Sequence, residues 1–577
     1  MADEFNANAH QTCGCDSPRL FPEFEPATYE TWYQEAVASL KGAPFEKKVI
    51  TKTYEEIDLQ PMYWAKDVED LPHMGALPSY PAYARGTEPG GYVLKPWDIC
   101  QEIDCSTPQE FNEVARHDLA RGQNALKLVL DRSSRRGLDP DVHSNNDWVG
   151  KNGLSLATVD ELGTALRGID LRTTPLMIHA GAVALPMVVL LAAYLRHQGD
   201  SLADIRCCVG ADPLAELVTE GELRVPFATA YDTMSTLVSW SKGHAPHLQT
   251  ILVHGSPYHD AGGSAVQELA YAIATGVEYL RELSKRRLSV DDVAPCMRFV
   301  FSLGPNFFME IAKLRAARLL WAQVVQAFGG SPEAQKMTIH ARTSAYTKTV
   351  CDPYVNMLRN TTEAFSGAMG GVDSMHVCPF DEPIRPADEF SRRVSRNLQI
   401  ILQEEAHFVH PIDPAGGSWY IEKLADSVAR KAWKLFQDVE AAGGMTQALL
   451  EGLPQAAVAA RKAKNIDTRK DIKVGTNMYP NLKEIPLAAP NMDFKALQSK
   501  RAGQVQAYRL QSDLFKLYDQ LGDFRIKIGG LQHGIRRRAG SGNRSEKWPM
   551  NLKRLKAAVP ASWWSKWART GMTEVPK

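Results

Sequence analysis

The sequence predicts an α/β protein whose core is a (β/α)8 TIM barrel, and three observations support this fold class. Between about residues 125 and 430, short β-rich runs alternate with longer segments of 3.6-residue apolar periodicity. The runs are short and almost wholly apolar, which is typical of parallel strands buried on both faces. Six such strand–helix units in succession favour a closed parallel barrel over an open sheet.

The expected elements follow one another in a regular order. The β-rich runs lie at 126–131, 174–181, 248–255, 296–304, 336–343 and 374–380. The segments with helical periodicity lie at 183–197, 264–285, 306–328, 353–369, 389–406 and 420–440. Because the loops that follow the strands meet at the carboxyl-terminal face of a barrel, we expect functional side chains in those loops.

Four regions are expected along the chain. Residues 1–75 form an N-terminal arm, an amphipathic helix and an alternating strand-like run, whose apolar face must contact the barrel or another subunit. Residues 76–450 form the barrel, and 451–530 a helical linker region. Residues 531–577 hold eleven Lys or Arg against two Glu without sustained periodicity, which predicts a disordered basic tail. A role of this tail in binding nucleic acid or membrane is the alternative.

Composition excludes several classes of function. The formal net charge of −1 opposes attraction of the whole protein to nucleic acid or an anionic membrane. The longest apolar stretch, "VALPMVVLLAAYL", is shorter than the roughly 20 residues that span a bilayer, and the acidic N-terminus does not resemble a signal peptide. The nine scattered cysteines suit reduced thiols, so we expect a cytoplasmic protein. Cys13 and Cys15 are either a metal-binding pair or two spare thiols, and we expect no metal site.

The stretch "GSPYHDAGG", residues 255–263, is a candidate active-site loop. Tyr258 and His259 stand where an apolar run gives way to a helical pattern, so both are candidate catalytic residues. His179 and His340 lie at the ends of two other expected strands. A structural role is the alternative for each histidine.

Three long motifs reveal a resemblance to a known family. They are "GPNFFMEIAKLRAARLLWAQVV" (304–325), "RPADEFSRRVSRNLQIILQEEAHFVHPIDPAGGSWYIEKL" and "ARGTEPGGYVLKPWDICQEI". The chain, over roughly residues 20–490, resembles the adenosylcobalamin-dependent acyl-CoA mutases, above all methylmalonyl-CoA mutase. The resemblance implies a barrel that threads acyl-CoA along its axis, and a separate C-terminal Rossmann-like domain that holds the cobalamin through an Asp-x-His-x-x-Gly motif.

That cobalamin motif has no counterpart here. The nearest string, Asp141-Val-His143-Ser-Asn-Asn146, ends in Asn and lies within the barrel region. About 87 residues follow position 490, too few for a doubly wound domain and its linker. We therefore expect the C-terminal cobalamin-binding domain to be absent and this chain to bind no cofactor itself.

Several positions that the resemblance assigns to the substrate are degenerate. Pro257 stands at the position of the catalytic histidine, and His259 lies two residues further on, where the family has Gln. A proline side chain offers no hydrogen-bond donor. Arginines that bind coenzyme A or face the substrate, and a tyrosine beside the reacting centre, are replaced as well. Glu220, where the resemblance implies a substrate-facing arginine, is expected to repel the charges of acyl-CoA. The degenerate positions are Pro257, Glu102, Cys100, Glu220 and Cys296.

The replaced positions bear on which of two functions this chain has within the family that it resembles. A chain that retains its packing motifs and loses its substrate contacts suits the small, non-catalytic subunit of a heterodimeric methylmalonyl-CoA mutase. The large subunit would then bind adenosylcobalamin and interconvert succinyl-CoA and methylmalonyl-CoA. The alternative is the barrel subunit of a split acyl-CoA mutase that uses a separate cobalamin-binding chain. Which acyl-CoA the complex handles stays open.

Overall fold

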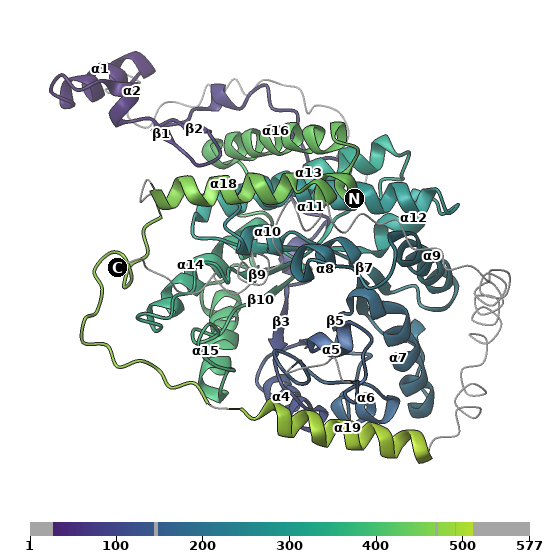
Figure 1. Ribbon diagram of the computed structural model, residues 1–577. Coiled ribbons are helices and arrows are strands. Elements are labelled where there is room, and N and C mark those ends of the chain that lie inside the picture. Colours follow the sequence, from purple (N-terminus) through teal and green to yellow (C-terminus); the bar gives the residue numbers. More distant parts are fainter. Residues whose placement is uncertain (1–26, 143–147, 468–470, 491, 512–577) are drawn as a thin grey trace, which may run out of the picture. The chain divides into compact units, whose positions relative to one another are not determined.

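The computed structural model describes residues 27–142, 148–467, 471–490 and 492–511 (Figure 1). It divides into two compact units, Met1–Tyr63 and Trp64–Lys577. The first unit contains α1 (Tyr29–Ser39), α2 (Phe45–Lys48) and a short antiparallel pair, β1 (Thr51–Lys52) and β2 (Asp58–Leu59). The expected helix is therefore present, and the expected strand-like run is mostly irregular.

The helix of the first unit begins where its sequence provides a cap. The Thr28 Oγ1 accepts a hydrogen bond from the backbone N–H of Thr31 at 3.1 Å, which satisfies one of the free donors of the first turn. Trp32 and Tyr33 pack on the ring of Phe45, with centroids 6.1 and 4.8 Å away. The residues after Tyr63 belong to the second unit, where the His73 Nε2 lies 3.0 Å from the Glu422 Oε2.

Eight parallel strands close into a barrel, which confirms the predicted fold class. Strand β10 pairs with both β9 and β3, so the sheet has no free edge. The strands are β3 (Asp98–Ile103), β4 (Ala125–Val129), β5 (Leu176–His179), β6 (Cys207–Ala211), β7 (Leu248–His254), β8 (Met297–Leu303), β9 (Thr338–Thr343) and β10 (Ser374–His376). Six of them match the expected runs. Strands β3 and β6 were not predicted, because β3 carries acidic residues and β6 contains an internal glycine.

Helices surround the barrel (Figure 1). Those that follow strands and cover the sheet are α4 (Pro108–Leu119), α7 (Ala184–Gln198), α9 (Phe227–His244), α11 (Ala265–Ser284), α13 (Phe307–Ala327), α14 (Val355–Gly370) and α15 (Glu389–Ile400), which ends in a π-helical turn, Ile401–Glu405. Shorter helices are α3 (Gly91–Leu94), α5 (Arg132–Arg135), α6 (Val159–Ala165), α8 (Pro213–Glu220), α10 (Ser256–Asp260) and α12 (Val290–Val293).

Helix α16 (Trp419–Ala441) adds a further layer over α11 and α13. Because these two helices lie between the barrel and α16, most of their side chains are buried. Their close approach needs a glycine: a Cβ on Gly276 would lie 2.7 Å from the Trp321 ring. Among the described helices, Gly181–Gln198, which includes α7, is long and apolar enough to cross a membrane, but half of it is buried in the protein, as in a core helix.

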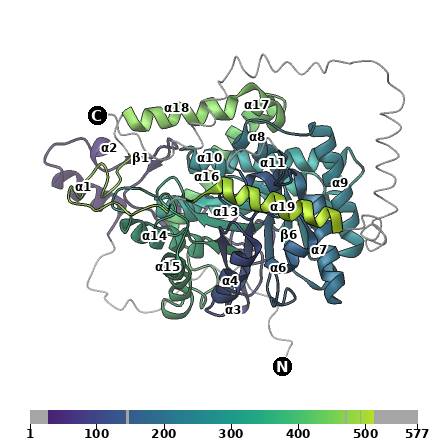
Figure 2. The same ribbon diagram turned by 60° about the horizontal axis from the view of Figure 1, so that its bottom comes forward.

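In the described part of the chain, three helices follow α16 in the sequence. They are α17 (Met445–Glu451), α18 (Leu453–Asp467) and α19 (Phe494–Gln511). Helix α19 lies next to α4 and α6 in Figure 1 and crosses in front of the barrel in Figure 2, and the Arg501 guanidinium is 2.7 Å from a Glu161 carboxylate oxygen. Within the expected linker region 451–530, the described residues include helices α18 and α19, whereas 471–490 contain no helix. Cys13, Cys15, His143, Asn146 and the expected basic tail 531–577 lie outside the described residues.

Candidate functional site

An apolar layer crosses the barrel where the resemblance predicts a substrate channel. The Lys127 Nζ of β4 lies 3.3 Å from the His340 Nε2 of β9, so these two side chains meet inside the barrel. Residues two positions apart on a strand point to the same face of the sheet. The residues two positions before such inward-facing side chains therefore also point into the barrel. That layer is completely buried and consists of Cys100, Ala125, Met177, Cys208, Leu252 and Val300.

Leu252 fills the space that a glycine leaves open. A Cβ on Gly210 would lie 2.2 Å from the Leu252 Cγ, so the leucine occupies the position of a side chain on β6. Cys100, one of the degenerate positions, belongs to the same layer, and burial raises the pKa of its thiol to about 12. The barrel axis at this level is therefore a packed core rather than a channel.

A polar layer lies next to it, toward the carboxyl ends of the strands. The Lys127 Nζ is 2.6 Å from the Glu102 Oε1, and the His340 Nδ1 is 2.8 Å from the Ser374 Oγ. Burial acts to raise the pKa of Glu102, but the charges of Arg342 and Lys127 outweigh it and hold that pKa well below its usual range. Glu102, which stands where the family has a tyrosine, is thus an ion-paired anion inside the barrel.

One group of side chains has the composition of a metal site. Potential ligand atoms of His376, Cys378 and Glu382 lie within 4.8 Å of one another. However, the Arg342 guanidinium already occupies this place, 3.2 Å from the Cys378 Sγ and 2.8 Å from a Glu382 oxygen. Burial also raises the pKa of the Cys378 thiol to about 12. The backbone N–H of Glu102 donates to the His376 Nδ1, which leaves the proton on Nε2, so neither side chain is ready to bind a metal.

The loop 255–263 forms α10 and the turn after it, and its two candidate catalytic residues are engaged with protein groups. Tyr258 is buried against the Tyr271 ring, 4.9 Å between centroids. The His259 Nε2 lies 2.8 Å from the Ser344 Oγ, and its Nδ1 is 3.6 Å from a Glu268 oxygen. Burial lowers the pKa of His259 well below its usual range, so the ring is neutral. Pro257 stands in the first turn of α10.

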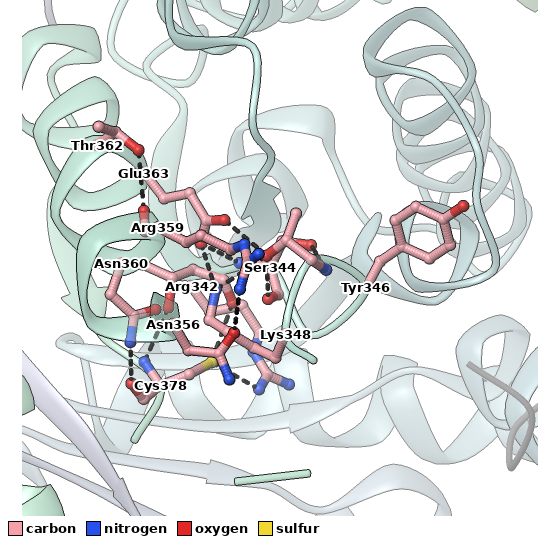
Figure 3. Close-up of polar contacts among 12 residues, drawn as sticks. Arg342, Ser344, Tyr346, Lys348, Asn356, Arg359, Asn360, Thr362, Glu363 and Cys378 are labelled. Atoms are coloured by element: carbon pink, nitrogen blue, oxygen red, sulfur yellow. Dashed lines mark hydrogen bonds and ion pairs between the residues drawn. The ribbon is translucent and has the colours of Figure 1, made fainter. Parts of the chain in front are cut away.

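The hydroxyl partner of His259 is itself fixed by the loop after β9 (Figure 3). The backbone N–H of Ser344 donates to a Glu363 oxygen at 3.1 Å, and the same carboxylate is 2.6 Å from the Lys348 Nζ. All three side chains are buried. His259 therefore links the loops after two barrel strands, which favours a structural role over a catalytic one.

The structural role of His259 predicts a difference between two substitutions. His259→Ala leaves the Ser344 hydroxyl without its partner and creates a cavity, at an expected cost of about 2–3 kcal/mol in the free energy of unfolding. His259→Gln, which restores the residue type the family has there, retains a polar group and is expected to cost less than about 1 kcal/mol. Urea unfolding of both variants measures the difference. Equal losses would mean that the hydrogen bond does not stabilise the fold.

Glu220 does not repel a substrate in the way its substitution for an arginine suggests. It ends α8, and its carboxylate is 2.6 Å from Arg132, 3.5 Å from Arg136 and 3.9 Å from Arg135. The charge is therefore neutralised within the chain. The expected repulsion is replaced by a set of ion pairs at the carboxyl-terminal face of the barrel.

A second glutamate of α8, Glu216, gives a prediction for pH dependence. Burial raises its pKa to about 7; the Arg136 guanidinium opposes this rise and the Glu220 carboxylate adds to it. The folded state therefore holds the proton more tightly than the unfolded chain, whose glutamates titrate near pH 4.3. The resulting stabilisation is present below about pH 4.5 and is lost as the pH rises through about 7.

Glu216→Gln removes this titration. Relative to the wild type, the variant is expected to gain on the order of 1–3 kcal/mol in unfolding free energy between pH 5 and pH 8. Urea unfolding at several pH values checks the slope. Glu333→Gln is the matched control, since its carboxylate is 78% exposed. A difference between wild type and Glu216→Gln that does not change with pH would contradict the assignment.

Several polar residues of the barrel, His254 and Arg342 among them, were not singled out from the sequence. The His254 ring lies against that of the candidate His179, with centroids 4.2 Å apart and planes tilted by 34°, and the His254 Nδ1 is 2.8 Å from an Asp212 oxygen. His254 and Arg342 lie at or near the carboxyl ends of strands, and period-two alternation along β7 and β9 was the signal that could have pointed to them. Cys296 lies apart from this group, before β8, with its Sγ 3.3 Å from the Asp292 carbonyl oxygen.

Four barrel histidines each have a ring nitrogen in contact with another residue: His254 with Asp212, His259 with Ser344, His340 with Ser374 and His376 with Glu102. None of these four histidines stands in an Asp-x-His-x-x-Gly string, the motif that the resemblance implies for cobalamin. Asp141, from the string nearest to the cobalamin motif, is 2.6 Å from Arg509. Helix α18 covers the loop after β7, with Lys462 against Gly262 and Val458 against Gly263.

Comparisons with known proteins agree with this architecture. A family model described as methylmalonyl-CoA mutase matches residues 52–529. The chain is 33% identical over 488 residues to the methylmalonyl-CoA mutase of Cereibacter sphaeroides, covering 84% of this chain and 69% of that protein. It is 36% identical over 480 residues to the methylmalonyl-CoA mutase small subunit of Porphyromonas gingivalis, covering 82% and 72%. For the large subunit of that organism the identity is 32% over 474 residues, covering 81% and 66%.

Proposed function

The chain belongs to the methylmalonyl-CoA mutase family, and from this premise we propose that it is the small, non-catalytic subunit of a heterodimeric mutase. In this proposal the large subunit binds adenosylcobalamin and interconverts succinyl-CoA and methylmalonyl-CoA. This chain stabilises the complex and binds no cofactor. Its seven described cysteines are free thiols, which supports a reducing, cytoplasmic location.

The observation that carries the proposal is the apolar layer across the barrel. Met177 and Leu252 lie among completely buried side chains on the axis where the family threads its substrate. A thioester chain could pass only if this layer were displaced, and displacing a packed core costs several kcal/mol. Pro257 adds that the position aligned with the family's catalytic histidine offers no side-chain donor to a substrate carbonyl.

The split-mutase alternative also needs a substrate channel. A barrel subunit that borrows a cobalamin-binding chain would still have to bind acyl-CoA itself. The packed axis and the loss of coenzyme A arginines at Cys100 and Cys296 oppose this. The relatives from Porphyromonas gingivalis are named as small and large subunits, which supports pairing with a homologous chain.

Activity measurements test the proposal. The isolated chain, supplied with adenosylcobalamin and methylmalonyl-CoA, is expected to give no turnover, with or without a small cobalamin-binding protein. Co-expressed with a large mutase subunit, it is expected to co-purify in an active complex. Turnover by this chain with only a cobalamin-binding protein would overturn the proposal and favour the split mutase.

We propose that the first unit binds the large subunit, and a truncated chain tests this. Removing Met1–Tyr63 is expected to abolish co-purification with the large subunit while the unfolding temperature of the remaining chain changes by only a few degrees. The cut falls before residue 64 because His73 contacts Glu422 within the second unit. A truncated chain that still forms the complex would move the interface to the barrel.

A further inference from the structure

Three arginines converge on one carboxylate at the carboxyl-terminal face of the barrel. Arg132 and Arg135 belong to α5, Arg136 follows them, and all three lie within 4 Å of Glu220 on α8. The Glu220 carboxylate is only 12% exposed. The Arg132 guanidinium also lies over the Trp148 ring, 4.1 Å from its centroid. We name Arg132, Arg135, Arg136 and Trp148 the arginine cluster.

The arginine cluster is held in place by groups outside it. Asp131, completely buried, caps α5 by accepting from the backbone N–H of Ser134 at 2.7 Å. Its second oxygen accepts from the N–H of Gly150 at 2.7 Å, which fixes the segment that carries Trp148. A Cβ on Gly153 would lie 2.6 Å from the backbone at Leu130, so the two segments pack backbone to backbone. The backbone that carries the three arginines is thus positioned independently of Glu220.

Of the two carboxylates that pair with the cluster among the described residues, Glu220 is the less exposed. Glu222 pairs with Arg136 at 2.5 Å, but its side chain is 66% exposed and contributes little. The Nε of each of the three arginines has no hydrogen-bond partner among the described residues. Guanidinium groups match carboxylates in geometry and charge, and partial burial strengthens the pairing.

We propose that the arginine cluster is a carboxylate-binding site whose occupant in this chain is its own Glu220. Because Glu220 is tethered to α8, its effective concentration at the cluster excludes a free carboxylate. The residue that replaces a substrate-facing arginine thus acts as an internal ligand that closes the site. The ligand class is a small monocarboxylate, and no covalent step is involved.

Carboxylate rescue of a truncated side chain tests the site. Glu220→Ala removes the internal ligand and leaves room for acetate. The unfolding temperature of this variant is expected to fall by on the order of 5 °C in sodium chloride. Replacing chloride by acetate at the same ionic strength is expected to restore at least half of that loss with saturation. An identical response to acetate and chloride would overturn the proposal.

Two matched variants separate the site from general salt effects. Glu220→Gln fills the space with a neutral amide, so acetate should not stabilise it more than chloride does. Glu222→Ala removes the exposed partner of Arg136 and should likewise show no specific rescue. Specific stabilisation of either variant equal to that of Glu220→Ala would contradict the assignment.

If Glu220→Ala does not purify in folded form, its refolding yield in acetate and in chloride gives the same comparison. A higher yield in acetate supports the site, and equal yields count against it. The measurement needs neither a partner subunit nor turnover. Its outcome is therefore independent of the proposed role of the chain in a mutase.

Discussion

Replacing Lys313 by Met is expected to lower the free energy of unfolding by about 3–5 kcal/mol, because it leaves two buried carboxylates without their counter-ion. The Lys313 side chain is 0% exposed, and its Nζ is 2.5 Å from a Glu268 oxygen and pairs with Glu310 as well. The same Nζ donates to the Ser302 carbonyl oxygen at 2.6 Å. Lys313 therefore joins α11, α13 and β8 in the interior.

The pH dependence of the Lys313→Met variant follows from the same contacts. Burial already raises the pKa of Glu268 to about 7, although Lys313 acts to lower it. Without the ammonium group, Glu268 and Glu310 must take up protons for the chain to fold. Proton uptake becomes easier as the pH falls, so the loss of stability is expected to be smaller at pH 5 than at pH 8.

An exposed lysine provides the control for this prediction. Lys434 pairs with Asp438 at 2.8 Å on α16, but its side chain is 72% exposed. Lys434→Met is expected to change the unfolding free energy by less than about 1 kcal/mol. Urea unfolding of both variants at pH 5 and pH 8 makes the comparison. A loss below about 1 kcal/mol for Lys313→Met would show that the buried pairs do not stabilise the fold.

Leu252→Ala is expected to cost about 2–5 kcal/mol in unfolding free energy, as for other completely buried leucines. Leu252 lies against Gly210, which has no side chain to move into the space left behind. The neighbouring layer contains the Lys127–Glu102 pair, so collapse of the barrel onto the cavity would disturb a buried charge. We therefore expect a cost toward the upper part of that range.

Leu482→Ala is the matched control, since this leucine is 92% exposed. Its substitution is expected to change stability by less than about 0.5 kcal/mol. Thermal and urea unfolding of the two variants measure the contrast. A cost for Leu252→Ala close to that of the control would mean that the apolar layer is loosely packed, and the argument against a substrate channel would lose its main support.

The sequence was sufficient for the order and type of most elements, because the signals are local. Helix α11 was predicted at 264–285 and spans Ala265–Ser284, and α13 was predicted at 306–328 and spans Phe307–Ala327. Both begin after a residue whose side chain caps the helix, Ser264 and Asn306. Strand β3 was not predicted because Glu102 interrupts the apolar pattern of the strand. The residue that pairs with Glu102, Lys127, lies on another strand.

By itself, then, the sequence determined the alternation of strands and helices and the resemblance to the mutase family, and it predicted that Pro257 is a degenerate position. Only the tertiary structure decided which charges are neutralised and whether the barrel axis is filled. Barrel closure brings Arg132 to Glu220, and Gly210 to Leu252, across many residues of intervening chain. Periodicity and spacing describe neighbours in the chain, whereas ion pairing and packing depend on distances in space, so a glutamate expected to repel a ligand lies instead among three arginines.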